Sequence, residues 1–180
     1  MFVKVCGITA PEQIDGAVEL GYTAAGVVLH PGSARFCSAR QASELARHAR
    51  GRIATVAVGL TYDEVAGVAD EFDYVQVYAF KNTERVICAG DSEQVARDAA
   101  LFMYDSSRGS GRTGPFPEWL HGIRRKLIIS GGLTPRNVAQ VVRKFHPFGV
   151  DVSSGVESAP GEKDYELMRQ FISEVTYAIR

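Results

Sequence analysis

Short apolar segments alternate with helical patterns along almost the whole of this chain, and this alternation limits its fold more than any other feature. Eight segments are typical of buried strands: Phe2–Cys6, Ala24–Leu29, Ile53–Val58, Tyr74–Tyr78, Arg85–Cys88, Leu101–Asp105, Lys126–Ile129 and Gly149–Val152. Helical patterns lie between or after them, at Pro11–Leu20, Ser38–Arg50, Thr61–Asp70, Ser92–Ala99, Glu118–Arg125, Thr134–Lys144 and Lys163–Ile179. The alternation predicts βαβ units and therefore an α/β protein with a parallel sheet.

Several of the predicted helices carry start signals. Ser38 is a residue type that favours the N-cap position, and Gly51 follows the predicted end of the same helix. Thr61 and Glu64 have the T-x-x-E spacing of a capping box, in which each residue satisfies a backbone N–H of the first turn. These signals predict helices that start at Ser38 and Thr61.

The number of predicted strands distinguishes between two parallel-sheet folds. An open doubly wound sheet usually has about five or six strands, whereas a closed (β/α)8 barrel has eight. The chain has 180 residues, and such barrels usually begin at about 200. The link at residues 78–85, YAFKNTER, is too short to hold a crossover helix. We therefore predict one domain, residues 1–180, folded as a compact (β/α)8 TIM barrel whose fourth helix is missing or much shortened.

Composition and charge argue against several classes of function. The formal net charge of −1 gives no overall basic field for nucleic acid or an anionic membrane surface. No apolar segment approaches the roughly 18 residues of a membrane span, and the first residues, MFVKVCGIT, lack the pattern of a signal peptide. The cysteines and histidines show no metal-ligand spacing, and a dinucleotide fingerprint is missing. We therefore expect a cytoplasmic protein with no metal, no cofactor, no nucleic acid and no membrane partner.

Two glycine-containing segments follow the seventh and eighth predicted strands. They are Ser130-Gly131-Gly132-Leu133 and Ser153-Ser154-Gly155-Val156. Glycine lets backbone N–H groups approach a phosphate closely, and barrels commonly hold phosphate in the loops after strands 7 and 8. The alternative is that these glycines only form tight turns. Two such loops in the expected places favour a phosphate site at Gly131, Gly132, Ser154 and Gly155.

Four further side chains lie in predicted strands, at their ends or in the loop that follows one. Cys6 is a candidate base, although a single cysteine is more often a small buried hydrophobe. Asp105 ends an apolar strand and is a candidate acid; otherwise it is a helix cap or turn residue. Arg35 is a candidate clamp for a carboxylate or an aromatic ring, with a solvated surface arginine as the alternative. Lys4 is expected inside the barrel as a paired structural lysine.

The chain resembles the phosphoribosylanthranilate isomerase family of tryptophan biosynthesis. The matching segments follow the family's order along the chain. They are VKVCGIT from Val3, Ser33–Arg35, DSSRGSGRTG from Asp105, SGGLTPRNV from Ser130, VDVSSGVE from Val150 and PGEKD from Pro160.

The resemblance implies a (β/α)8 barrel that converts N-(5-phosphoribosyl)anthranilate to 1-(2-carboxyphenylamino)-1-deoxyribulose 5-phosphate by an Amadori rearrangement. It implies that Cys6 is the general base, that Asp105 is the general acid and that Arg35 contacts the anthranilate. The loops at Gly131–Gly132 and Ser154–Gly155 then hold the phosphate. Because the reaction is intramolecular and redox-neutral, no cofactor or metal is required. The expected partner is a phosphorylated small-molecule substrate, and the expected assembly is a monomer or a homodimer.

Two segments depart from the family's pattern. Where the family usually has Q-L-H-G, this chain has Gln76-Val77-Tyr78-Ala79, which affects the pocket beside the fourth and fifth strands. Where the family usually has G-G-T-G, this chain has Gly111-Arg112-Thr113-Gly114, whose arginine either adds positive charge near the phosphate or only alters the loop. Neither departure touches Cys6 or Asp105.

Two alternative functions remain open. One is a dual-substrate isomerase that also acts on the histidine-pathway aminoimidazole ribonucleotide, although that sister family has aspartate at the position of Cys6. The other is a catalytically inactive phosphate-binding barrel with a regulatory or assembly role. The presence of Cys6, Asp105 and Arg35 argues against this second alternative.

Overall fold

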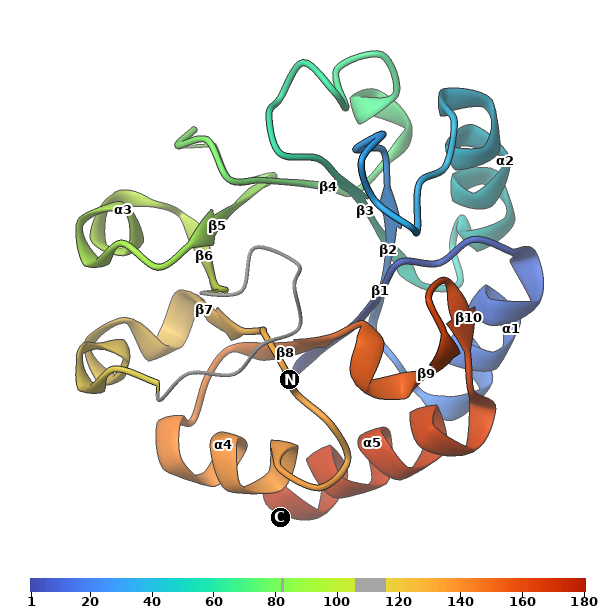
Figure 1. Ribbon diagram of the computed structural model, residues 1–180. Coiled ribbons are helices and arrows are strands. Elements are labelled where there is room, and N and C mark those ends of the chain that lie inside the picture. Colours follow the sequence, from blue (N-terminus) through green and yellow to red (C-terminus); the bar gives the residue numbers. More distant parts are fainter. Residues whose placement is uncertain (82, 106–115) are drawn as a thin grey trace.

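The protein is a closed barrel of eight parallel strands in a computed structural model that describes residues 1–81, 83–105 and 116–180. Each strand pairs with its neighbours in the chain, and β8 pairs with β1. The strands are β1 (Phe2–Cys6), β2 (Ala24–Val28), β3 (Ala54–Val58), β4 (Tyr74–Val77), β5 (Val86–Gly90), β6 (Leu101–Tyr104), β7 (Leu127–Ile129) and β8 (Gly149–Val152). Figure 1 looks along the barrel, with the helices outside the ring of strands. The predicted fold is confirmed.

The barrel has two apolar layers because successive side chains of a strand point to opposite faces. Along β1, Val3 and Val5 face outward and join the core between strands and helices. Cys6 faces inward and joins an interior cluster that includes Val56 and Met103. The predicted strands are short and almost wholly apolar for this reason: both of their faces are buried.

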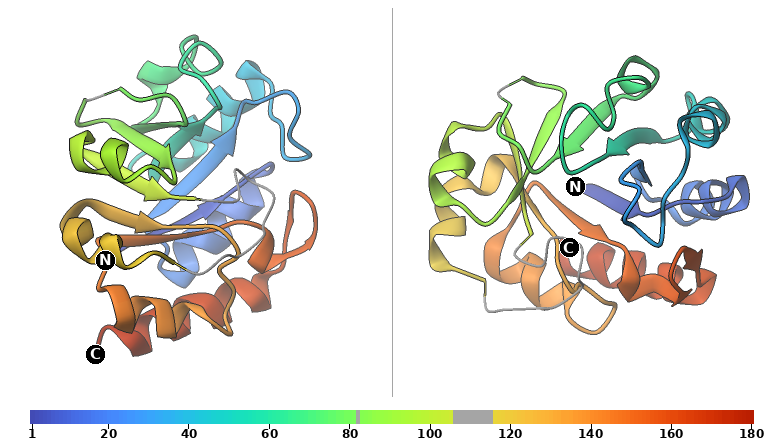
Figure 2. Two further views of the ribbon diagram at one scale, coloured as in Figure 1. Left: turned by 60° about the vertical axis from the view of Figure 1, so that its left-hand side comes forward. Right: turned by 45° about the horizontal axis from the view of Figure 1, so that its top comes forward.

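Five α-helices lie outside the strands in the described part of the chain: α1 (Pro11–Leu20), α2 (Ala39–Ala49), α3 (Glu93–Asp98), α4 (Val138–Phe145) and α5 (Tyr165–Ala178). Ser38 is the N-cap of α2, and its hydroxyl and Gln41 form a capping box. In Figure 2, α4 and α5 lie side by side against the barrel wall, in agreement with their mutual contacts. No helix within the described ranges is long and apolar enough to cross a membrane.

The predicted helix over Thr61–Asp70 is wrong. The connection from β3 to β4 consists of turns and one short 3-10 helix, η1 (Ala69–Glu71). The carboxylate of Glu64 accepts a hydrogen bond from the backbone N–H of Leu60 and contacts His30. These contacts hold it away from the position that the predicted capping box with Thr61 requires. Gly67 also disfavours a helix within this segment.

The missing fourth helix is confirmed for the described residues: positions 78–81 and 83–85 between β4 and β5 contain no helix. The predicted helix at Glu118–Arg125 is instead a 3-10 helix, η2 (Glu118–Lys126). A 3-10 helix repeats every three residues, so Leu120 and Ile123 lie on one side, and both are buried. These short connections explain how a barrel is formed by only 180 residues.

The segments around the last two strands place two loops at the barrel mouth. Helix α4 begins at Val138, one turn later than the predicted Thr134, because the side chain of Asn137 accepts a hydrogen bond from the Thr134 backbone and donates one to Gly132. After β8, the chain forms η3 (Ser154–Val156) and a small hairpin of β9 (Glu157–Ala159) and β10 (Glu162–Lys163). The Gly111–Gly114 segment with Arg112 lies outside the described residues.

Candidate active site

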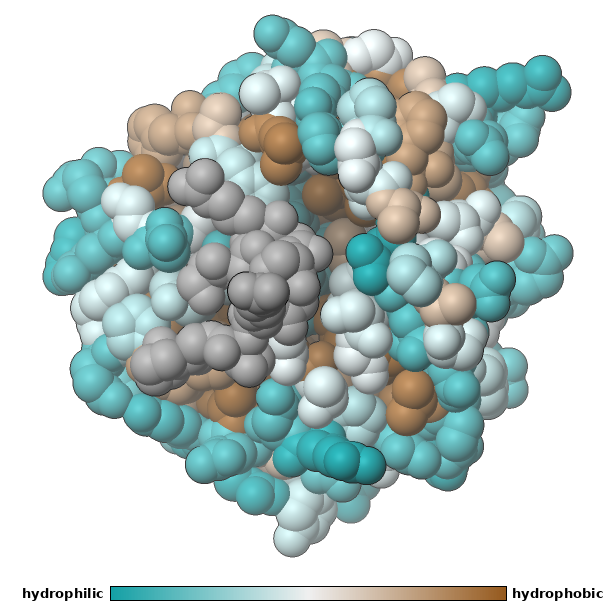
Figure 3. All heavy atoms as spheres, in the orientation of Figure 1, coloured by the Kyte–Doolittle hydropathy of each residue, from teal (hydrophilic) through white to brown (hydrophobic). Residues whose placement is uncertain are grey.

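A cavity of about 440 Å³ opens at the carboxyl ends of the strands. Its described lining comes from the ends of β1 to β4 and β6 to β8 and from the loops that follow them. Figure 3 shows this face hollowed near its centre, with hydrophobic and hydrophilic side chains around the hollow. All seven sequence-predicted site residues lie at this end, and those lining the cavity are Cys6, Arg35, Asp105, Gly131, Gly132 and Ser154. Gly155 follows directly after Ser154.

Cys6 faces the cavity above a buried ion pair. Lys4, one inward position earlier on β1, is fully buried, and its Nζ lies 2.8 Å from Oδ1 of Asp151 on β8. Ser130 donates a hydrogen bond of 2.8 Å to the other oxygen of Asp151. The expectation that Lys4 is a paired lysine inside the barrel is confirmed.

This ion pair sets the charge around the thiol. Burial alone would lower the pKa of Lys4, but the charges of Asp151 and Cys6 outweigh it and raise the pKa above its usual value. Lys4 is therefore a cation. Burial raises the pKa of the Cys6 thiol, the positive charge of Lys4 partly offsets this rise, and the negative charge of Asp151 adds to it. The positive charges of Lys4 and Lys163 therefore favour a thiolate that burial and Asp151 disfavour.

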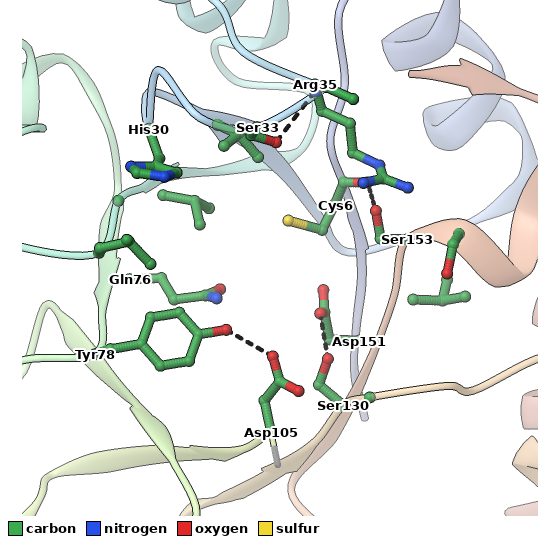
Figure 4. A pocket seen from close by; sticks show the side chains of 18 of the residues that line it. Cys6, His30, Ser33, Arg35, Gln76, Tyr78, Asp105, Ser130, Asp151 and Ser153 are labelled. Atoms are coloured by element: carbon green, nitrogen blue, oxygen red, sulfur yellow. Dashed lines mark hydrogen bonds between the residues drawn. The ribbon is translucent and has the colours of Figure 1, made fainter. Parts of the chain in front are cut away.

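Asp105 enters the cavity from the end of β6, and Figure 4 shows its side chain and that of Cys6 directed into the same space. Its carboxyl group is buried, and its backbone N–H donates to the carbonyl of Gly90. Oδ2 accepts a hydrogen bond of 2.6 Å from the hydroxyl of Tyr78. A cysteine and a carboxyl group on separate strands therefore face one cavity, as proton transfer to and from a bound molecule requires.

Arg35 is held by an acidic partner and is not a solvated surface arginine. Its Nε and Nη2 donate to the two carboxylate oxygens of Glu157 at 2.8 and 2.6 Å. Lys163 also contacts this carboxylate, at 2.5 Å. Burial alone would raise the pKa of Glu157, but the hydrogen bonds from Arg35 and Lys163 outweigh it and lower the pKa. Glu157 is thus an ionised support that fixes the plane of the Arg35 guanidinium beside the cavity.

The two glycine loops touch each other through their backbones. A Cβ atom added to Gly155 would lie 1.9 Å from the carbonyl oxygen of Leu133, so the loops could not keep this spacing with any other residue there. Gly131 and Gly132 have φ angles of 83° and 68°, which favour glycine. The glycines therefore allow both a tight turn and a close approach between the loops after β7 and β8.

Sequence reasoning did not assign individual roles to several residues that shape the site. Tyr78 and Gln76 are on the inward face of β4 or directly after it, and Figure 4 shows both at the cavity. Among the residues that the structure describes, Oε1 of Gln76 is the buried side-chain polar atom without a hydrogen-bond partner. Gln76 is a polar residue on the inward face of an otherwise apolar strand, and this pattern could have identified it from the sequence. Three further residues support the site from distant positions in the chain. Asp151 pairs with Lys4. Glu157 pairs with both Arg35 and Lys163.

Comparison with known proteins agrees with this architecture. The family model for N-(5'-phosphoribosyl)anthranilate isomerase matches residues 3–174. The enzyme of that name from Halorhodospira halophila is 39% identical over 204 residues, which cover 96% of this chain and 95% of the relative. The solved phosphoribosyl anthranilate isomerase from Thermus thermophilus has a TM-score of 0.84 at 29% identity and covers 100% of both chains.

A further solved isomerase of this kind is a complex with reduced 1-(o-carboxyphenylamino)-1-deoxyribulose 5-phosphate. It has a TM-score of 0.82 at 29% identity, with 98% of this chain and 99% of that chain covered. The family match, the near-complete coverage by relatives and the shared barrel all agree. The chain belongs to the N-(5'-phosphoribosyl)anthranilate isomerase family.

Proposed function

We propose that the chain is the isomerase of tryptophan biosynthesis that converts N-(5-phosphoribosyl)anthranilate to 1-(2-carboxyphenylamino)-1-deoxyribulose 5-phosphate. The observation that carries this proposal is the placement of Cys6 and Asp105 on different strands at one cavity. The family match supplies the substrate, and the complex of a solved relative with a reduced form of the product supports the same choice.

The reaction divides into an acid step and a base step. Asp105 gives a proton to the ring oxygen of the ribose as the C1–O bond breaks, which leaves a Schiff base between C1 and the anthranilate nitrogen. The Cys6 thiolate then removes the proton on C2, and the electrons of that C–H bond form the enolamine. The enolamine tautomerises to the C2 ketone as its C2 hydroxyl loses a proton and C1 gains one. Lys4 stabilises the thiolate before the second step.

The substrate phosphate is proposed to bind the backbone N–H groups of Gly131, Gly132, Ser154 and Gly155. The loops after β7 and β8 are a common phosphate site in barrels, and here they lie against each other at the cavity. Oε1 of Gln76, which lies inside the same cavity, is then an acceptor for a ribose hydroxyl.

Gly155→Ala should weaken phosphate binding because the added Cβ forces the two loops apart. We expect KM for the substrate to rise about tenfold or more, the cost of about one charge-assisted hydrogen bond, with a smaller change in kcat. Gly67→Ala is the matched control, since a Cβ there meets no atom within 4 Å. Steady-state kinetics and competition by inorganic phosphate measure the effect. Unchanged KM and unchanged phosphate inhibition would place the phosphate elsewhere.

Arg35 is proposed to contact the carboxylate or the ring of the anthranilate with the part of its guanidinium that Glu157 does not engage. We expect Arg35→Ala to lower kcat/KM by roughly tenfold to a hundredfold, and Arg35→Lys to recover little of it. Lysine has neither the planar face nor the two-pronged bond to Glu157. Arg40→Lys, at an exposed arginine, is the control. A lysine variant with nearly wild-type kcat/KM would contradict a planar contact.

The activity itself is tested by incubating the purified chain with N-(5-phosphoribosyl)anthranilate and, separately, with the histidine-pathway aminoimidazole ribonucleotide. We expect turnover of the first substrate alone. Turnover of both would support the dual-substrate alternative, and turnover of neither would support a binding barrel without catalysis. The monomer or homodimer assembly and the cytoplasmic location stay predictions.

A further inference from the structure

Tyr78 contacts the carboxyl group to which the proposed function gives the acid role. It directly follows β4, and its hydroxyl lies 2.6 Å from Oδ2 of Asp105 across the barrel mouth (Figure 4). The two residues are 27 positions apart in the chain, so the contact depends on the closed barrel. Tyr78 also stands in the segment where this chain departs from the Q-L-H-G of the family it resembles.

The backbone holds both partners of this hydrogen bond. The N–H of Tyr78 donates to the carbonyl of Leu60 at 3.1 Å, and the N–H of Leu60 donates to Glu64 at 2.7 Å. On the other side, the N–H of Asp105 donates to Gly90 at 2.9 Å. Backbone hydrogen bonds therefore fix the positions from which the side chains of Tyr78 and Asp105 meet.

Tyr78 is the donor in this pair. Burial raises the pKa of its hydroxyl, and the nearby carboxylate of Asp105 raises it further. The other titratable groups that act on it are Cys6 on β1 and Asp151 on β8, and both also raise the pKa. Since Lys4 is paired with Asp151, none of these groups draws the proton away from Tyr78. A hydroxyl that keeps its proton donates to a carboxylate.

We propose, building on the acid role of Asp105 in the proposed function, that Tyr78 is a positioning residue for this acid. Its hydroxyl orients the carboxyl group toward the cavity. When Asp105 has given its proton to the ring oxygen, the same hydroxyl bonds a carboxylate, and such charge-assisted bonds are stronger than neutral ones. The bond therefore stabilises the state after proton transfer more than the state before it. Tyr78 keeps its own proton throughout, and the transferred proton comes from Asp105.

The test compares Tyr78→Phe with Tyr74→Phe. Tyr74 begins β4 and Tyr78 directly follows it, and both pack against the interior cluster of the barrel. Tyr74 therefore lies at the opposite end of the strand, where its ring contacts Phe2. We expect Tyr78→Phe to lower kcat roughly tenfold to a hundredfold, the range for a hydrogen bond to a charged group, with little change in KM. Tyr74→Phe should keep wild-type kcat.

The split between kcat and KM separates positioning from packing. Without the Tyr78 hydroxyl, the state after proton transfer loses one charge-assisted hydrogen bond, so the loss in Tyr78→Phe should fall on kcat. A lost packing contact at the cavity would instead weaken substrate binding and raise KM. Wild-type kcat in Tyr78→Phe, or a loss confined to KM, would overturn the proposal.

The variant Asp105→Asn distinguishes this proposal from the function on which it rests. If Asp105→Asn keeps wild-type kcat, the acid role itself is wrong. If Asp105→Asn loses activity but Tyr78→Phe does not, only the positioning role is wrong. We expect Tyr78→Phe to cause no further loss when it is added to Asp105→Asn, because the hydroxyl acts through the carboxyl group. An independent, multiplied loss in that double variant would also overturn it.

Discussion

Replacing Asp105 by asparagine should lower kcat at least roughly hundredfold, about 2.7 kcal/mol of barrier, because the amide keeps the shape of the side chain but has no proton to give. The ring oxygen of the ribose would then leave as an unstabilised oxyanion. Asp105 is buried at the end of β6 and bonded to Tyr78, so the variant retains a polar group that Tyr78 can still reach. KM should change little.

Steady-state kinetics on N-(5-phosphoribosyl)anthranilate measure this loss, and thermal unfolding checks that the barrel is intact. Asp91→Asn is the matched control, since Asp91 follows the neighbouring strand β5 and is exposed. A kcat for Asp105→Asn close to that of wild type would remove Asp105 from the acid role.

Replacing Cys6 by serine should also lower kcat at least roughly hundredfold, the usual size of a general-base contribution, with a modest change in KM. A thiol has an ordinary pKa of about 8.5, whereas a serine hydroxyl hardly ionises near neutrality. Burial raises the pKa of Cys6, so the thiolate is the minor form at neutral pH, and the charge of Lys4 counteracts this loss. Serine cannot use that charge because it has no accessible anionic form.

The control for this variant is Cys37→Ser, at a second buried cysteine whose Sγ lies near the carbonyl of Ile8 and not in the cavity. It should keep the wild-type rate. Near wild-type kcat for Cys6→Ser would mean that another group is the base.

The strands were predictable because both faces of each are buried, which leaves short apolar segments with clear ends. The side chains at strand ends were predictable for a related reason: the barrel fold places the carboxyl ends of all strands at one mouth. The places of Cys6, Asp105 and the loops at Gly132 and Gly155 at this mouth therefore follow from the sequence.

The supporting contacts could not be predicted, since they join residues far apart in the chain. Lys4 and Asp151 are 147 positions apart, and Arg35 and Glu157 are 122 apart. Their pairing depends on the closure of β1 on β8 and on the hairpin after η3, which no local pattern indicates. The helix predicted from Thr61 does not form for a similar reason. Glu64 makes a hydrogen bond with His30, which belongs to a different loop.

In the proposed mechanism, the acid and the base act in separate, successive steps, and the kcat of the double variant Cys6→Ser/Asp105→Asn tests this division most directly. For successive steps, the slower step alone limits the rate, so we expect a double variant about as slow as the slower single variant. Two groups whose contributions to the same rate-limiting barrier are independent would instead multiply their losses. A double-variant kcat equal to the product of the two single losses would contradict the divided acid–base pair of Cys6 and Asp105.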